Sequence, residues 1–163
     1  MGTMIKIGMA ELNVCLPPDA ITTLGLGSCV GIALYDPVTK VAGLAHIMLP
    51  DSTQIRNNEN KAKFADTGIR ELVQLMTVAG ANKSRLVAKI AGGAQMFAFQ
   101  SSTNSDMARV GERNVEATKK TLKEMNIKIL AEDTGLNYGR TVEFYSETGD
   151  FVIKSVGKPV KTI

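Results

Sequence analysis

The feature that most constrains the fold is a β-hairpin pattern in the first third of the chain. Strand-like sequence runs from Cys29 to Tyr35 and again from Lys40 to Leu49, and residues 36–39 between them, Asp-Pro-Val-Thr, have turn chemistry. With the turn centred between its second and third residues, Cys29 lies directly opposite His46 on one face, with Cβ atoms about 4.5–5.5 Å apart. The pattern therefore predicts that a thiol and the only imidazole of the chain lie side by side.

Strand patterns outnumber helical patterns over the rest of the chain. Strands are predicted over residues 4–16, 20–24, 85–91, 127–131, 141–145 and 151–156. Apolar residues at helical spacing predict helices over 64–79, which Gly80 is placed to end, and over 114–125. Polar stretches at 51–60 and 100–106 predict loops. Because the two helices lie in the middle of the order, we expect an α/β (α+β) layered sandwich with mixed β-sheets, in one domain spanning residues 1–163.

Composition excludes several classes of function. The net charge of +3 is small, and no block of Lys and Arg is present, so nucleic-acid binding is not expected. No apolar run approaches the roughly 20 residues of a membrane span, and no secretory signal pattern is present. We therefore expect a cytoplasmic protein without direct membrane insertion. Two cysteines and one histidine are too few for a disulfide scaffold or a zinc site, so no metal and no cofactor is expected.

Cys29 and His46 together indicate nucleophilic catalysis. The thiolate is the reactive form of cysteine, and a neighbouring imidazole can take the thiol proton and later donate it to a leaving amine. Cys29 follows Gly25-Leu26-Gly27-Ser28, whose backbone N–H groups can point at a developing oxyanion. The alternative interpretation is that both side chains belong to the core, where free cysteine is common.

A third group is needed to orient the histidine ring. Thr23 is the favoured candidate, because it ends the strand that leads into the cysteine loop and its hydroxyl can bond the far ring nitrogen. The alternatives are Asp36, Asp51 and Asn13. The second cysteine, Cys15, lies in a short apolar run and is interpreted as a small buried hydrophobe.

The remaining glycine and aromatic motifs are less specific. Gly25-x-Gly27 is followed by no helical pattern and lacks the Gly-Lys-Ser/Thr of a phosphate loop, so a nucleotide site is not expected. Gly92-Gly93 follows a predicted strand and indicates either a tight turn or close approach to a substrate chain. Phe97 and Phe99 are candidate anchors for a partner protein.

Five segments carry a family resemblance. They are residues 23–30 (TLGLGSCV), 45–51 (AHIMLPD), 88–97 (AKIAGGAQMF), 111–115 (GERNV) and 130–135 (LAEDTG). Taken together and in this order, they resemble the CheD family, the chemoreceptor glutamine deamidases of bacterial chemotaxis. The segments spread from position 23 to position 135, so the resemblance covers most of the chain.

The resemblance implies a catalytic set of Cys29 as nucleophile, His46 as base and Thr23 as orienting residue. It implies an α/β sandwich similar to certain deamidating bacterial toxins. The substrates implied are glutamine side chains on the helical cytoplasmic part of chemoreceptors, and the CheC phosphatase is implied as a binding partner.

With the residues and the resemblance combined, we expect a cysteine amidohydrolase that works through a thioester. Gly27, Ser28, Gly92 and Gly93 are the candidates for oxyanion and substrate binding. The rival hypotheses are a non-catalytic docking module that acts on CheC and receptors, and a transglutaminase-like enzyme in which an amine replaces water.

Overall fold

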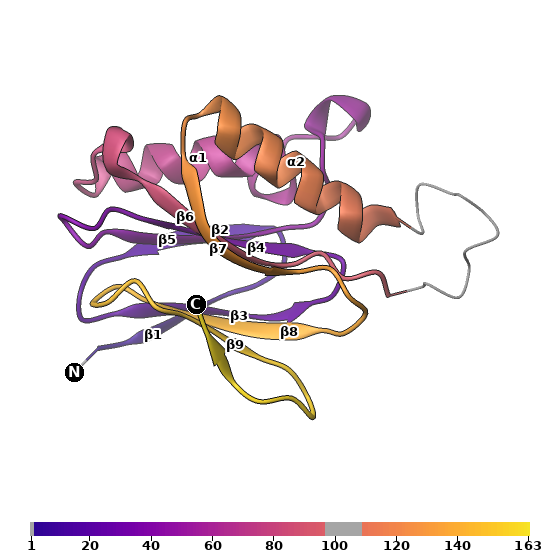
Figure 1. The fold of residues 1–163 in the computed structure, drawn as a ribbon. Coiled ribbons are helices and arrows are strands. Elements are labelled where there is room, and N and C mark those ends of the chain that lie inside the picture. Colours follow the sequence, from indigo (N-terminus) through magenta and orange to yellow (C-terminus); the bar gives the residue numbers. More distant parts are fainter. Residues whose placement is uncertain (1, 97–108) are drawn as a thin grey trace.

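The fold is a stack of three layers: one β-sheet, a second β-sheet, and a pair of helices on the outer face of the second sheet (Figure 1). The computed structural model describes residues 2–96 and 109–163. The first sheet contains, in spatial order, β1 (Met4–Ile7), β3 (Ala20–Leu26), β8 (Arg140–Tyr145), β9 (Phe151–Lys154) and β10 (Lys161–Thr162). The second sheet contains β2 (Glu11–Cys15), β5 (Ala42–Ile47), β4 (Val30–Tyr35), β6 (Val87–Gly92) and β7 (Lys128–Thr134). We call them the β3 sheet and the β4 sheet.

Both sheets are mixed. In the β3 sheet β1 pairs in parallel with β3, and in the β4 sheet β6 pairs in parallel with β7, whereas the other pairs are antiparallel. Within the described residues, the helices are α1 (Ala65–Val78) and α2 (Val110–Glu124), and short 3-10 helices cover Ser52–Gln54, Lys61–Lys63 and Lys83–Arg85. The predicted mixed α/β class with two main helices is thereby confirmed.

The central strands β4 and β5 are buried on both faces, which explains their almost continuous apolar sequence. Val30, Ile32 and Leu34 of β4 pack toward the helices, in one hydrophobic core. Cys29 and Ala33 belong to a second core, between the two sheets. Alternation along the strand therefore sends Cys29 toward the β3 sheet rather than toward the helices.

The hairpin register differs from the predicted one. Gly31, not Cys29, is the partner of His46, and Val30 pairs with Ile47. Cys29 precedes β4 and is diagonal to His46 on the same face, since residues two apart on a strand share a face. The prediction that the two residues lie directly opposite is therefore wrong, although the prediction that they share a face is right.

The turn explains the shift in register. The backbone N–H of Asp36 donates to the Val41 carbonyl (3.1 Å), and the N–H of Lys40 donates to the Asp36 carbonyl (2.7 Å). These bonds enclose residues 37–40, with Lys40 at φ 62°, so the turn is centred one residue later than predicted. At this φ value Lys40 has a left-handed backbone conformation. The sequence does not predict this conformation, because glycine is the usual residue there.

The Asp36 carboxylate holds this turn in place and supports a first testable prediction. It accepts two hydrogen bonds from Arg85 (3.0 and 2.8 Å) and others from the backbone N–H groups of Val38 (2.9 Å) and Asn82 (2.8 Å). The Arg85 guanidinium, followed by these amides, holds the pKa of the buried carboxyl well below its usual range. Because Arg85 is partly exposed, we expect Asp36→Asn to lower the free energy of unfolding by about 2–3 kcal/mol.

Urea unfolding at neutral pH measures this loss. Glu124→Gln is the matched control, because the Arg70–Glu124 ion pair is about half exposed on both sides and is expected to contribute less than about 1 kcal/mol. Equal effects of the two substitutions would show that the Asp36 cluster does not stabilise the fold.

The predicted elements agree with the structure over most of the chain. The helix predicted over 64–79 is α1, and Gly80, at φ 113°, follows its end. The second helix begins at Val110, four residues earlier than predicted, and β7 extends to Thr134. Strand β10 was not predicted. The loop predicted at 100–106 lies outside the described residues.

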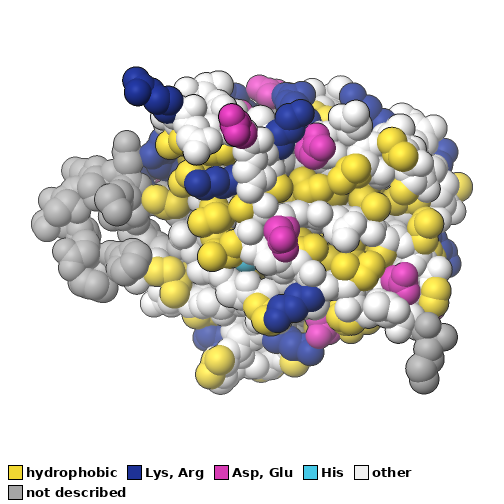
Figure 2. Space-filling view, turned by 180° about the vertical axis from the view of Figure 1, so that it is seen from behind, with side chains coloured by type: hydrophobic (Ala, Val, Ile, Leu, Met, Phe, Trp, Pro, Cys, Tyr) yellow, Lys and Arg dark blue, Asp and Glu magenta, His cyan; other side chains and the backbone are white. Residues whose placement is uncertain are grey.

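The charged side chains on the surface shown in Figure 2 are of mixed sign. On the face shown in Figure 2, basic and acidic side chains are interspersed, so this face has no patch of a single sign. Among the described helices, neither is long and apolar enough to cross a bilayer.

Candidate active site

A hydrogen bond between the two sheets joins Thr23 to His46. Thr23 lies on β3, His46 lies on β5, and both side chains are fully buried. The Thr23 Oγ1 is 2.7 Å from the His46 Nδ1, and it donates to the Ile7 carbonyl at 2.9 Å. A hydroxyl has one proton and the carbonyl can only accept, so Thr23 accepts from Nδ1–H. The proton on Nδ1 leaves Nε2 of the neutral ring as an acceptor.

The free nitrogen of His46 has the properties of a general base. Nε2 is buried and has no hydrogen-bond partner among the described residues. Burial lowers the pKa of His46 to about 4, because the low-dielectric surroundings disfavour the charged ring. His46 is therefore neutral at neutral pH, and its unprotonated Nε2 is available to accept a proton.

Burial also governs the Cys29 thiol. It raises the pKa of the thiol above its ordinary value, and the backbone N–H of the same residue opposes this increase in part. Cys29 and His46 are thus both uncharged at rest, which is the starting state for proton transfer during attack rather than for a preformed thiolate–imidazolium pair.

Two backbone bonds support the loop that carries Cys29. The N–H of Gly93 donates to the Cys29 carbonyl, and the N–H of Ala94 donates to the Gly27 carbonyl, both at 2.8 Å. Gly92 has φ 108°, and a Cβ placed there would lie 2.3 Å from the Cys29 carbonyl oxygen. The Gly92-Gly93 turn therefore approaches the backbone of the cysteine loop at a distance that only glycine allows.

The side chains of the other predicted orienting residues form hydrogen bonds with groups other than His46. Asp36 bonds Arg85, Asp51 accepts from the N–H of Thr53 at 2.8 Å, and Asn13 accepts from the N–H of its neighbour Val14. Cys15 is buried between the sheets, where desolvation raises the pKa of its thiol to about 11. Phe97 and Phe99 lie outside the described residues.

Sequence reasoning missed one side chain at this site. Asn114, on α2, is fully buried and donates from Nδ2 to the carbonyl oxygens of Ser28 (2.9 Å) and Met48 (3.0 Å). The sequence interpretation used position 114 as the start of an amphipathic helix and as part of the resembling segment 111–115, and gave its side chain no role. The signal available was its spacing, since Asn114 precedes the buried Thr118 by one helical turn.

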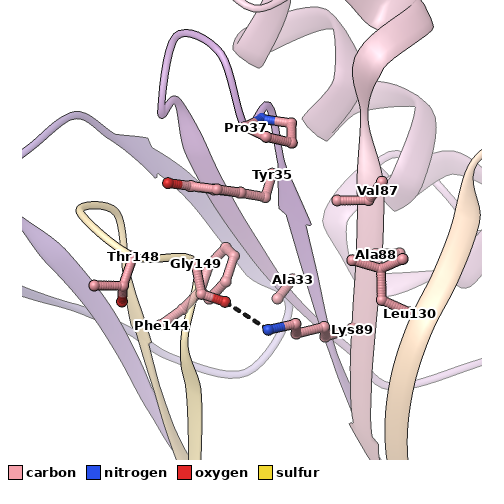
Figure 3. A pocket seen from close by; sticks show the side chains of 10 residues that line it. All are labelled: Ala33, Tyr35, Pro37, Val87, Ala88, Lys89, Leu130, Phe144, Thr148 and Gly149. Atoms are coloured by element: carbon pink, nitrogen blue, oxygen red, sulfur yellow. Dashed lines mark hydrogen bonds between the residues drawn. The ribbon is translucent and has the colours of Figure 1, made fainter. Parts of the chain in front are cut away.

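The pocket shown in Figure 3 is separate from this site. It has a volume of about 190 Å³ and is lined by ten residues, including Tyr35, Lys89 and Phe144. The Lys89 ammonium donates to the Gly149 and Ile163 carbonyls, both at 2.8 Å. Tyr35 ends the strand that Cys29 precedes, so the two sites are about 20 Å apart along β4.

The low pKa of His46 has a consequence for stability. The unfolded chain has a histidine pKa of about 6.5, so between pH 6.5 and 4 it binds more protons than the folded protein. The free energy of unfolding therefore falls as the pH is lowered through this window, by roughly 3 kcal/mol from this residue. Urea unfolding at several pH values measures the fall, and His46→Gln is expected to lack it. Parallel curves for the wild type and the variant would contradict the buried neutral state of His46.

Comparison with known proteins identifies the family. A sequence model described as "CheD chemotactic sensory transduction" matches residues 48–155. "Probable chemoreceptor glutamine deamidase CheD" of Lachnoclostridium phytofermentans is 71% identical over 163 residues, with all of both chains covered. "Chemoreceptor glutamine deamidase CheD" of Halalkalibacterium halodurans is 54% identical, again with both chains fully covered.

A third relative and one solved structure complete the comparison. "Probable chemoreceptor glutamine deamidase CheD" of Caldanaerobacter subterraneus is 58% identical, with 98% of each chain covered. The crystal structure of the Bacillus licheniformis hypothetical protein YfiH superposes with a TM-score of 0.39 at 14% identity, over 72% of this chain and 47% of that one, and supports no inference. The family model begins after Thr23, Cys29 and His46, but the full-length relatives also span these positions. The chain therefore belongs to the CheD family.

Proposed function

We propose that the protein is a cysteine amidohydrolase that converts glutamine side chains of chemoreceptors to glutamate, with Cys29 as nucleophile, His46 as base and Thr23 as orienting residue. The observation that carries the proposal is the Thr23–His46 hydrogen bond, which leaves Nε2 unprotonated and buried on the face that Cys29 shares. The names of the relatives, chemoreceptor glutamine deamidases, supply the substrate.

The first half of the reaction forms a thioester. The Cys29 sulfur attacks the carboxamide carbon of the glutamine while Nε2 of His46 takes the thiol proton. The carbonyl oxygen becomes an oxyanion in the tetrahedral intermediate. When this intermediate collapses, the protonated His46 gives its proton to the departing nitrogen, and ammonia leaves.

The second half hydrolyses the thioester. Nε2 of His46 takes a proton from a water molecule, which attacks the thioester carbon. The carbon–sulfur bond then breaks, the proton returns to the sulfur, and glutamate and free enzyme remain. In both halves the hydrogen bond from Nδ1–H to Thr23 stabilises the charged ring and keeps the tautomer that has Nε2 free.

Backbone donors of the cysteine loop are the proposed oxyanion hole. The N–H groups of Ser28 and Cys29 bond no oxygen or nitrogen acceptor within residues 2–96 and 109–163. The carbonyls on the same two peptide units, those of Gly27 and Ser28, are bonded to Ala94 and Asn114. We assign Gly27 and Ser28 to the oxyanion loop, and Gly92 and Gly93 to its support, because Gly92 and Gly93 contact its backbone.

Trapping the thioester tests this mechanism. The protein is mixed with a cytoplasmic receptor fragment, quenched in acid and digested, and the peptide that contains Cys29 is examined by mass spectrometry. We expect a covalent adduct of the receptor segment, minus ammonia, on Cys29 and none on Cys15. Glutamate formation without any adduct on Cys29, under quench conditions that preserve thioesters, would contradict the covalent route.

The proposal retains two further points that the resemblance implies, binding of the CheC phosphatase and similarity of the fold to deamidating toxins. The aromatic anchors expected for a partner, Phe97 and Phe99, belong to residues 97–108, outside the described part. A docking module alone has no use for a buried histidine whose Nε2 has no partner among the described residues, since such a group is costly to keep. We therefore favour the enzyme over the docking module.

A further inference from the structure

We propose that Asn114 is a positioning residue of the Cys29 site: its side-chain amide fixes the peptide unit that precedes the nucleophile and ties it to the strand that carries His46. This inference rests on the proposed function, because it assigns Asn114 to the same reaction. It goes further in naming a residue of α2, a helix that supplies none of the three groups proposed for the chemistry.

The hydrogen-bond partners of the Asn114 side-chain amide determine which way it faces. Both partners of Nδ2 are carbonyl oxygens, of Ser28 and of Met48, which can only accept hydrogen bonds. The amide nitrogen must therefore face them, and each of its two protons has one acceptor. Ser28 is adjacent to Cys29, and Met48 is two residues after His46, so one side chain spans the backbone next to both reacting groups.

The two hydrogen bonds of Asn114 lie just beyond the point where the backbone pairing of β4 and β5 ends. Pairing between β4 and β5 ends at Val30 and Ile47. Beyond this pair, the carbonyls of Ser28 and Met48 have no ladder partner and are bonded by Asn114 instead. The side chain thus replaces one rung of the sheet at the point where the nucleophile and the base must stay in register.

The bond to Ser28 also fixes the direction of a proposed oxyanion donor. The Ser28 carbonyl and the Cys29 N–H belong to one planar trans peptide unit, in which they point in opposite directions. With the carbonyl held by Asn114 under α2, the N–H is turned the other way, toward the Cys29 sulfur. The Ala94 N–H holds the Gly27 carbonyl in the same manner, which orients the Ser28 N–H.

Keeping an amide at this position has an energetic cost. The Oδ1 atom of Asn114 is buried and has no partner among the described residues, and such an acceptor is unfavourable in a core. Packing alone would be served better by an apolar side chain. The two donated hydrogen bonds are therefore what the asparagine contributes, one to the cysteine loop at Ser28 and one to Met48.

Asn114→Asp tests the inference, because a carboxylate has the same shape but no proton to donate. With a receptor fragment as substrate at pH 8, we expect kcat to fall about 10²-fold while KM stays within about twofold, since the substrate contacts remain and only the positioning is lost. A protonated carboxyl regains one donor. The ratio of variant to wild-type kcat is therefore expected to rise as the pH is lowered from about 8 to about 5.

Thr118→Val is the matched control. Thr118 is buried one helical turn away on α2, and its hydroxyl has no partner among the described residues, so the substitution keeps the packing and removes no bond. Its kcat is expected to equal that of the wild type. Activities are normalised to the folded fraction from circular dichroism, and Asn114→Ala, which removes the donors without adding charge, replaces the aspartate variant if that one does not fold.

Three outcomes decide the matter. A kcat-specific, pH-dependent loss in Asn114→Asp, with normal activity in Thr118→Val, supports the inference. Normalised kcat within about twofold of the wild type in Asn114→Asp or Asn114→Ala overturns it, because a lost oxyanion donor alone costs about 10²-fold or more. Retention of deamidation by Cys29→Ala would instead overturn the proposed function, so the two failures are distinguishable.

Discussion

Replacement of Cys29 by serine is expected to lower the rate of ammonia release from a receptor fragment by at least about 10³-fold. The hydroxyl is a far weaker acid than the thiol, and His46, whose pKa is about 4, is too weak a base to activate it. The large loss follows because both Cys29 and His46 are uncharged at rest. Without a strong base to activate the nucleophile, the reaction depends on the intrinsic nucleophilicity of sulfur, which serine lacks.

Cys15→Ser is the control for this substitution. Cys15 has a similar burial in the same core between the sheets, but it lies at the end of β2 and contacts Ser146 rather than His46. Initial rates of ammonia release within about twofold of the wild type are expected for this variant. A Cys29→Ser protein that retained a tenth of the wild-type rate would show that the sulfur is not the nucleophile.

His46→Gln is expected to lower kcat by about 10²–10⁴-fold, the usual contribution of a positioned general base. Glutamine occupies a similar volume but offers no nitrogen that can accept a proton from the thiol. Nε2 of His46 is a buried acceptor without a hydrogen-bond partner among the described residues, and the substitution removes it. Steady-state kinetics on the receptor fragment give kcat and KM separately, and the loss is expected in kcat.

A pair of threonine variants tests whether the ring needs its partner. Thr23 and Thr22 are neighbours on β3, and the Thr22 hydroxyl donates to the Val142 carbonyl at 2.8 Å, away from His46. Thr23→Val is expected to show part of the loss of His46→Gln, and Thr22→Val to remain near the wild type. A His46→Gln protein with unchanged kcat would exclude the histidine as base.

Local patterns were sufficient to predict much of the fold. Alternation and turn residues identified the hairpin, and helical spacing with Gly80 identified α1. The hairpin register was missed because it depends on Lys40, which adopts a positive φ without being glycine. The short strand β10 was missed because it pairs with β9 through only two residues, Lys161 and Thr162.

In the candidate site, too, some residues could be proposed from local sequence and others depend on tertiary packing. Gly27 to Cys29 and the lone His46 carry recognisable chemistry within a few residues of sequence, so local reasoning was enough to propose them. The predicted hydrogen bond between Thr23 and His46 is present, although it joins two different sheets and its formation depends on how the sheets stack. Asn114 lies 86 residues from Ser28, on a helix whose apolar stripe gave no indication of a contact with the loop. Such long-range polar contacts follow from tertiary packing, which periodicity does not encode.

The most direct test of the account is mass spectrometry of a chemoreceptor cytoplasmic fragment incubated with the wild type, Cys29→Ala or Cys15→Ala. We expect conversion of particular glutamines to glutamate by the wild type and by Cys15→Ala, and no conversion by Cys29→Ala. Equal conversion by all three proteins, or conversion by none on receptors from the same cell, would contradict the claim that Cys29 deamidates chemoreceptors.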